Sequence, residues 1–398
     1  MNHKKMIEEQ KDTNSNNKRY LDKMKGQFTL KYIFLYLKPN KQLQLIRYNK
    51  RYQEKLNIGI NDYEREYKKI EISIELNPIK NNPSKFINIT KKNEHHFHIF
   101  FNDDVRETTK KKNYIMKSDG VKKVKIVIDD GVKSLAKLFM ECKCIRRINF
   151  IKFNIKEINN MSRMFQGCSS LEEINFFNII TEKVKRMESM LSNCSSLKEI
   201  NLSKFETNNV RNMSWMFHGC SSLEKINLSD FSTKNVKDMR NMFFNCSSLT
   251  HLDLSSFDTN NVKDMQNMFG YCSSLESLDL SNFNTDSVGN MNAMFTGCSK
   301  LEILNLSNFH GYNVGNIGMM FQDCTSLKEL DLSQFVTNNI YNNGTITKFI
   351  TSSNASFFSN MKIKNVIITS GMFSGCKALK YSSVVDLLIL KELILDKY

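Results

Sequence analysis

A cysteine recurs at a fixed interval of 26 residues through most of this 398-residue chain. The interval extends back to Cys142 and, after one skipped position, forward to Cys376. The unbroken series is Cys168, Cys194, Cys220, Cys246, Cys272, Cys298 and Cys324. A period between about 20 and 50 residues is typical of arrays in which each unit buries its apolar face on its neighbours. The chain is therefore predicted to form a solenoid of stacked units, here called rungs, that functions through its surface.

Apolar residues keep the same period at fixed distances after each cysteine. Three residues on stand Leu171, Leu197, Leu223, Leu249, Leu275, Leu301 and Leu327. Further apolar positions follow six and eight residues on, which gives the pattern L-x-x-L-x-L. This pattern is typical of the strand segment of a leucine-rich repeat, where the last two leucines flank one outward-facing residue. Each rung is predicted to contain a short parallel strand.

The part of each rung that precedes the cysteine reads N-V-x-x-M-x-x-M-F-x-x-C. In one rung Val210, Met213, Met216, Phe217 and Cys220 have the spacing of one apolar helix face. The predicted fold class is therefore an α/β repeat, a leucine-rich-repeat solenoid with a short parallel strand and a short helix in each 26-residue rung. A small, mainly helical N-terminal region is expected to precede the solenoid.

Changes in composition predict the domain organisation. Residues 1–26 form a polar, basic tail that we expect to be disordered, and residues 27–76 form a helical module. Residues 77–120 are expected to be a linker with a small strand region. The solenoid is predicted to cover residues 121–398, beginning with a capping strand near Val121.

The C-terminal end of the array departs from the repeat. The rung at residues 337–371 keeps the length but has Ile350 in place of the cysteine and Ser353 in place of the leucine. It is predicted to be a degenerate rung, either a hinge or partner-specific insertion or the result of drift near an end, with drift favoured. The apolar residues 384–395 are predicted to cap the last rung.

The net charge of +16 is concentrated before residue 137. A patch that binds nucleic acid or anionic lipid is one interpretation, but the lysines are dispersed, so a solvated surface is favoured and no nucleic-acid partner is expected. There is no apolar run of the length that crosses a membrane, and residues 1–20 do not have the pattern of a secretory signal. Sequons at Asn201, Asn227 and Asn305 would place bulky glycans on the strand surface and block it, which favours the cell interior. The predicted location is cytoplasmic, with the cell surface as the alternative.

Neither catalysis nor metal binding is predicted. The repeating cysteines share one structural position and are expected to be buried free thiols, while Cys142 and Cys144 form only a C-x-C pair. His96 and His98 supply two metal ligands at most. Phosphate-loop, nucleophile-elbow and zinc-protease motifs are absent from the sequence. The chain is predicted to have no enzymatic activity, no cofactor and no metal.

Outward-facing strand positions are the candidate partner-binding residues, because a surface that varies from rung to rung can encode specificity. The varying position is occupied by Glu173, Glu199, Lys225, His251, Ser277, Ile303 and Glu329. A nearly constant column two residues later includes Asn201, Asn227, Asp253 and Asp279. Such a column is more typical of a structural role, with hydrogen bonds along the stack. The first hypothesis is a scaffold that binds a partner protein on a concave strand face, although a merely solvated surface fits the same residues.

The rung F205-E-T-N-N-V-R-N-M-S-W-M-F-H-G-C-S-S-L-E-K-I-N-L-S-D230 resembles the repeats of the BspA-like leucine-rich-repeat surface proteins. The resemblance covers residues 132–336 and 366–380, so it extends over about 132–380. It implies the leucine-rich-repeat fold. It also implies an adhesin-like role at a cell surface, bound to host or matrix proteins.

Residues 28–56 resemble an F-box, most clearly in L-x-x-I-F-x-Y-L from Leu30 and L-x-L-I-R-Y-N-K-x-Y before Leu56. The usual L-P-x-E opening is absent. The resemblance implies a substrate adaptor whose residues 30–56 dock a ubiquitin-ligase scaffold while the repeats hold the substrate. A simple helical cap on the array is the alternative.

Overall fold

The computed structural model describes residues 50–56, 71–79, 84–102, 104, 113–176, 179–328, 330–332, 335, 348–349, 361–363, 367–368 and 371–378. The chain divides into two compact units, residues 1–71 and 72–398. The first contains helix α4 (Lys50–Leu56), which lies within the predicted helical module at 27–76 and ends where the F-box-like segment ends. The rest of the F-box-like segment and the predicted C-terminal cap at 384–395 lie outside the described residues.

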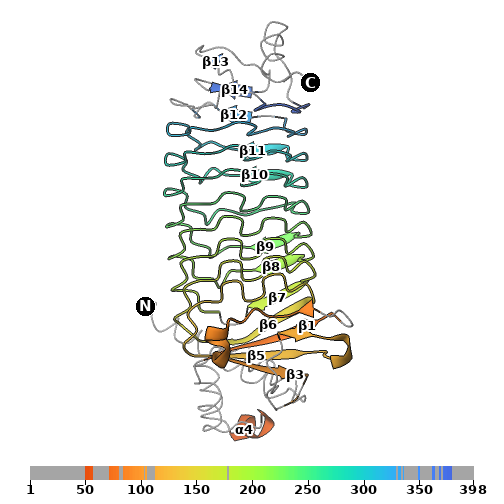
Figure 1. Cartoon of the computed structure of the whole chain (residues 1–398). Helices are drawn as coiled ribbons and strands as arrows, with labels where there is room; N and C mark the ends of the chain where they lie inside the picture. The colour runs from red at the N-terminus through yellow and green to blue at the C-terminus, as the bar shows by residue number, and fades with distance from the viewer. Residues whose placement is uncertain are drawn as a thin grey trace, which may run out of the picture. The chain divides into compact units, whose positions relative to one another are not determined.

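Short parallel strands follow the cysteines, as predicted, and form one side of the solenoid (Figure 1). They pair in register with the next rung, so that Glu199 lies beside Lys225 and Ser277 beside Ile303. The strands are β7 (Glu173–Phe176), β8 (Glu199–Asn201), β9 (Lys225–Asn227), β10 (Ser277–Asp279), β11 (Ile303–Asn305) and β12 (Leu330–Leu332). We call the outward side of these strands the strand face. Residues 250–253 form no strand, so the row is interrupted at that rung.

The predicted helix in each rung is wrong. The segment from eight residues before each cysteine to the cysteine itself is a run of turns in the described rungs. Alternate amides there donate to the next rung, as from Met213 to the Asp238 carbonyl at 3.1 Å and from Phe217 to Met242 at 2.9 Å. The amides between them donate three residues back along the chain, as from Met216 to Met213 at 3.3 Å. Because half of the amides bond between rungs, the i to i−4 ladder of a helix cannot form.

We call the outward side of these turn segments the turn face. Parallel bridges link its rungs one after another from Ser134 to Asn316. Each segment has two residues with a left-handed backbone. One precedes the cysteine directly, and the other, with φ between 51° and 61°, lies five residues before it, at Lys137, Arg163, Ser189, Trp215, Asn241, Asn267, Ala293 and Met319. The turn segments therefore stack as a second hydrogen-bonded ladder, opposite the strands.

The core consists of continuous columns between the two ladders. Leu223, Leu249 and Leu275 are fully buried, as the predicted stacking requires. Phenylalanine rings stack from rung to rung, with centroids 5.4 Å apart for Phe217 and Phe243 and 5.8 Å apart for Phe243 and Phe269. Stacked apolar columns exclude water along the whole array, which is why a single rung does not need a core of its own.

All ten cysteines are buried free thiols, as predicted. The Cys220 thiol donates to the Leu191 carbonyl of the preceding rung at 3.1 Å, and Cys272 donates to Phe243 at 3.2 Å. Burial raises the pKa of the Cys220 and Cys272 thiols to about 12. A small side chain with one weak donor fits this column because each site has one carbonyl to satisfy.

A column of buried threonines, which the sequence analysis did not identify, lies between the strand and the turn segment of each rung and bonds from rung to rung. The Thr233 hydroxyl donates to the Asp258 carbonyl at 2.7 Å and accepts from the Asp258 amide at 2.7 Å. The members are Thr181, Thr207, Thr233, Thr259 and Thr285. Each described hydroxyl bonds to the next rung, so these buried polar groups are satisfied between rungs.

A five-stranded sheet of order β3-β5-β1-β6-β7 closes the N-terminal end of the array. Strand β1 (Glu71–Pro78) runs antiparallel to β6 (Ile145–Phe153), and β3 (Phe97–Phe101) antiparallel to β5 (Val124–Asp129). Strand β6 pairs in parallel with β7 of the first regular rung. The strand closest to the capping strand expected near Val121 is thus β5, which belongs to a larger sheet. Strand β1 crosses the predicted boundary at residue 77 between the helical module and the linker. Beside the sheet lie β2 (Ser84–Lys85), β4 (Tyr114–Ile115) and the 3-10 turns η1 (Lys91–His96) and η2 (Lys117–Asp119).

The predicted degenerate rung at 337–371 does not supply the turn segment that follows Cys324. That place is taken by residues 371–376: the Phe321 amide donates to the Met372 carbonyl at 3.0 Å, and the Cys376 thiol to the Phe321 carbonyl at 2.9 Å. Residues 371–376 can stack here because Met372, Phe373 and Cys376 repeat the methionine, phenylalanine and cysteine of the other rungs. The sequence around Ile350 lacks this pattern. On the strand side β12 pairs with β14 (Met361–Ile363), and β13 (Lys348–Phe349) pairs with β15 (Ile367–Ile368).

Candidate functional site

The strand face brings the predicted variable residues into one line. Glu173, Glu199, Lys225, His251, Ser277 and Ile303 are all exposed, and Glu329 lies outside the described residues. Ile303 is 68% exposed, the highest value among the large hydrophobic side chains in the described part of the chain. Strand alternation puts these residues on the same side as the nearly constant column two positions later. These exposed residues follow one another from rung to rung between β7 and β11, and their role as partner-binding residues stays a prediction.

The nearly constant column makes local hydrogen bonds within each rung, and Asp279 also has a side-chain hydrogen bond with Asn305 of the next rung. The Asn201 side-chain oxygen accepts from the Ser203 amide at 3.0 Å, and Asn227 accepts from Ser229 at 3.1 Å. Asp253 and Asp279 make the same turn with the serine two residues on, at 2.9 Å each. Hydrogen bonds from Ser255 and from Ser281 lower the pKa of the two carboxyl groups. These side chains end each strand by satisfying a local amide.

A hollow of about 700 Å³ lies on the strand face where the row of strands is interrupted. Lys225, His251 and Asp253, three of the predicted residues, line it together with Thr250. The His251 Nδ1 atom lies 3.0 Å from the Thr250 hydroxyl. The bond from the Glu276 amide to the Thr250 carbonyl is 3.5 Å long, whereas the equivalent bond from Glu224 to Lys198 is 2.8 Å. The rung without a strand at 250–253 thus coincides with this recess in the predicted stripe.

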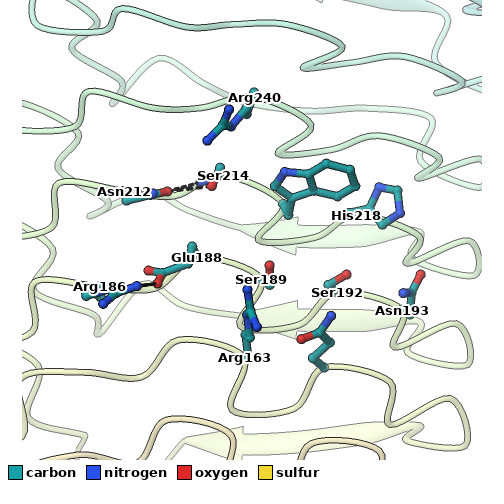
Figure 2. A pocket seen from close by; sticks show the side chains of 12 residues that line it. Arg163, Arg186, Glu188, Ser189, Ser192, Asn193, Asn212, Ser214, His218 and Arg240 are labelled. Atoms are coloured by element: carbon teal, nitrogen blue, oxygen red, sulfur yellow. Dashed lines mark hydrogen bonds and ion pairs between the residues drawn. The ribbon is translucent and has the colours of Figure 1, made fainter.

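The turn face carries a second hollow that the sequence analysis missed, with a volume of about 440 Å³ (Figure 2). Ser189 and Ser192 lie at its centre, while the neighbouring rungs have Arg163 on one side and Trp215 and His218 on the other. The recess arises because the two serine side chains are smaller than the side chains at the equivalent positions of the neighbouring rungs. A comparison of equivalent positions in three consecutive rungs would have predicted it, as would the place of Trp215, the single tryptophan of the chain.

Charged groups line one side of this hollow. Arg186 pairs with Oε1 of Glu188, a residue that is 8% exposed. Oε2 of the same carboxylate is buried and has no hydrogen-bond partner among the described residues. Arg240 lies 3.1 Å from Asp238, whereas Arg163 is exposed and makes no ion pair with the described part of the chain. Among the described residues, the lining of the hollow thus includes one arginine outside any ion pair, Arg163, and one buried carboxylate oxygen without a donor.

Aromatic rings extend from this hollow across the turn face. The Trp215 and His218 rings have centroids 4.6 Å apart, His218 stacks on Phe244 at 5.2 Å, and Phe244 meets Tyr271 at 5.3 Å. Burial lowers the pKa of His218, and its Nδ1 atom is buried without a partner among the described residues. The lowered pKa favours the neutral imidazole, whose ring contacts the Trp215 indole on one side and the Phe244 ring on the other.

Within the described residues no three histidine, cysteine, aspartate or glutamate side chains converge in a way that could hold a metal ion. His98, which the sequence analysis weighed as a ligand, lies 2.7 Å from the Asp129 carboxylate. The described helices also include none with the length and hydropathy needed to cross a membrane.

Comparisons with known proteins bear on the repeat array. The family model described as "Mycoplasma protein of unknown function, DUF285" matches residues 133–252, 237–360 and 272–385. No curated protein matches the chain. The family match does not include residues 30–56, so it gives no support for docking of this segment on a ubiquitin-ligase scaffold.

Three solved bacterial structures are similar to parts of this chain. A leucine-rich-repeat protein of T. pallidum is 20% identical, with 50% of this chain and 73% of that one covered and a TM-score of 0.25. A leucine-rich-repeat protein of Bacteroides ovatus is 17% identical, with 63% and 81% covered and a TM-score of 0.19. A leucine-rich cell surface protein of Faecalibacterium prausnitzii is 15% identical, with 79% and 99% covered and a TM-score of 0.24. The family matches span most of the 26-residue rungs, and the chain belongs to DUF285, a BspA-like leucine-rich-repeat family.

Proposed function

We propose that this chain is a non-enzymatic protein-binding scaffold whose partner lies along the strand face. The observation that carries the proposal is the line of exposed side chains from Glu173 to Ile303, which differ between most rungs and lie beside a column that is nearly constant. A constant column contacts every partner alike, whereas a varying one can select a partner.

The centre of the proposed interface is the hollow around His251. Interfaces concentrate their binding energy in a few residues that fill recesses near the middle of the contact. Lys225 and Asp253 place opposite charges at the two sides of this recess, and Ile303 offers an exposed apolar anchor two rungs away. A partner with an apolar side chain opposite Ile303 and polar groups opposite His251 would complement this arrangement.

Site-specific photocrosslinking in native extract tests the proposal. A photoreactive residue at Ser277, between the hollow and Ile303, is expected to capture one protein reproducibly, and the same residue at Lys237, which is exposed outside the strands, is not. The double variant Lys225→Glu and Ile303→Asp should reduce capture at least about tenfold, since interface anchors contribute 1 to 2 kcal/mol or more each. Equal capture from both positions, or capture that survives the double variant, would contradict the proposal.

The compartment is tested separately. The sequence predicts a cytoplasmic location, and the adhesin-like alternative places the same scaffold at the cell surface. Protease added to intact cells should leave a cytoplasmic protein uncut and should degrade a surface protein. Lysed cells provide the control, because the chain must be cleavable there for protection to be meaningful.

A further inference from the structure

Basic side chains form a column along one border of the turn face. They occupy the position directly before each turn segment, on four consecutive rungs. The members are Lys185, Arg211, Lys237 and Lys263, all exposed. Backbone hydrogen bonds join their rungs, from the Arg211 amide to the Lys185 carbonyl at 3.1 Å and from the Lys237 amide to the Arg211 carbonyl at 2.9 Å. We call these four residues the basic column.

The basic column lacks acidic partners. Neighbouring rungs are about 4.8 Å apart, so the four charges fall within about 14 Å. None of the four forms an ion pair within the described part of the chain, where the nearby Asp238 pairs with Arg240 instead. The Asp264 carboxylate accepts from the Gln266 amide at 2.9 Å. Adjacent members lie well within the screening length of about 10 Å and repel one another, so an anionic partner would stabilise the column.

Large apolar side chains are exposed beside the basic column. Trp215, Tyr271 and Met319 are 37%, 49% and 49% exposed, and they belong to alternate rungs of the array. In Figure 2, Arg186 and Asn212, which directly follow two members of the basic column, lie to the left of Trp215. We call the three exposed side chains the apolar row. The turn face thus presents cations and, next to them, apolar groups.

The repetition of this surface indicates the kind of partner. The basic column offers the same charge four times, so it has no feature that distinguishes one contact position from the next. Parallel bridges link the rungs from Ser134 to Asn316, so the column and the row extend along the stack. A surface that repeats over several rungs suits a partner that is broad and uniform.

We propose that the turn face docks on an anionic lipid surface. The basic column would lie among the charged headgroups, which attract lysine and arginine. Trp215 and Tyr271 would lie at the headgroup level, where rings with one polar atom are favoured, and Met319 would contact the acyl boundary. A linear acidic polymer would engage the column but leave the apolar row in water. A lipid surface uses both, and it leaves the strand face on the opposite side of the rungs accessible.

Vesicle sedimentation of the full-length protein tests the proposal. Vesicles of phosphatidylglycerol and phosphatidylcholine in equal parts are expected to bind the protein at least about tenfold more tightly than vesicles of phosphatidylcholine alone. Added salt should weaken the binding, because the column and the headgroups are exposed charges. Trp215 is the only tryptophan of the chain, so its emission should move to shorter wavelength on the anionic vesicles.

A pair of lysine substitutions tests the basic column. Lys237→Gln combined with Lys263→Gln should weaken vesicle binding about tenfold or more, since each charge near an anionic surface contributes about a factor of five. The matched control is Lys198→Gln combined with Lys204→Gln, which removes the same charge from exposed positions outside the turn segments. The control pair should leave the binding nearly unchanged.

A pair of serine substitutions tests the apolar row. Serine suits the backbone at Trp215 and Met319, because Ser189 has φ of 55° at the equivalent position and these residues have φ of 61° and 54°. Trp215→Ser combined with Met319→Ser should weaken sedimentation about fivefold or more. Tyr114→Ser, at a tyrosine that is 43% exposed outside the turn segments, should not. Urea unfolding curves establish that each variant is folded.

Three results would overturn the proposal. The first is binding to anionic vesicles that does not exceed binding to neutral ones. The second is vesicle binding that the Lys237 and Lys263 pair leaves intact, or that the control pair weakens equally. The third is vesicle binding that the serine pair leaves intact, which would make the basic column a site for acidic polymers, with polyglutamate as the probe. None of these results bears on the strand-face scaffold, whose test reads out from Ser277.

Discussion

The turn face and the strand face hold the same rungs together in different ways. On the turn face every described rung bonds to the next through alternate amides, with distances such as 3.0 Å from Trp215 to Arg240 and 2.9 Å from Phe269 to Met294. On the strand face most paired segments from β8 onward are three residues long, and the row is interrupted at 250–253. The difference teaches that the continuity of the array depends on the turn face, which leaves the strand face free to vary.

The largest effect is expected from the core behind the turn face. Phe269→Ala removes a fully buried ring that stacks on Phe243 and Phe295, and should lower the free energy of unfolding by about 3 to 5 kcal/mol. Leu252→Ala, at the half-buried position of the interrupted rung, should cost less than about 2 kcal/mol. Urea unfolding followed by circular dichroism measures both. A loss for Leu252→Ala that equals the loss for Phe269→Ala would break the comparison.

A second effect depends on pH. Burial raises the pKa of Cys272 from 9.0 to about 12, so the unfolded thiol ionises above pH 9 while the folded thiol stays protonated. Its contribution to stability is complete below pH 9 and is lost between pH 9 and about 12. The loss is about 1.4 kcal/mol per pH unit for each such thiol. Cys272→Ala should make the decline between pH 9.5 and 10.5 shallower by that amount. Ser273→Ala, which removes no titrating group, should leave the slope as it is.

A third effect tests the left-handed turns. Gly297 has φ of +72°, and an added Cβ would lie 2.7 Å from Cδ1 of Tyr271. Gly297→Ala should therefore destabilise the array by about 1 to 2 kcal/mol. At Gly289, where the nearest atom would be 3.8 Å away and φ is not left-handed, alanine should change stability by less than about 0.5 kcal/mol. Thermal unfolding of the two variants sharpens the comparison within the turn side, and equal melting temperatures would contradict it.

The smallest effect is expected on the strand face. Asp253→Ala removes an exposed acceptor that bonds to the Ser255 amide, and should cost less than about 1 kcal/mol. Asp253→Asn keeps the acceptor and should be closer to the native protein. Chemical denaturation measures the pair. A cost above about 2 kcal/mol for Asp253→Ala would show that this column supports the stack rather than a local turn.

The repeat length, the strand positions and the buried columns could be predicted because they depend on periodicity alone. Leu223, Leu249 and Leu275 are buried wherever the rungs stack, whatever backbone joins them. The turn segments could not be assigned in the same way. Met213, Met216, Phe217 and Cys220 have a spacing that fits a helix face and a run of turns equally well.

A signal for the turns was nevertheless present in the sequence. The residue before the cysteine is Gly167, Asn193, Gly219 and Asn245 in four consecutive rungs, and all four have a left-handed backbone. Glycine and asparagine tolerate this conformation better than other residues, which argues against an unbroken helix at that point. The hollow at Trp215 was harder to foresee, because it arises from size differences between neighbouring rungs. Such differences become visible only when equivalent positions are known to lie side by side.

The stacking of Cys376 on Cys324 has a consequence for how such arrays change length. The two cysteines are separated by two periods of sequence, yet the Phe321 and Phe373 rings meet at 5.4 Å, the same spacing as Phe217 and Phe243 in consecutive rungs. Every rung offers its successor an equivalent docking edge, so residues 371–376 stack on the rung of Cys324 as a consecutive rung would. An array joined in this way can gain or lose whole 26-residue units while the columns on either side keep their contacts.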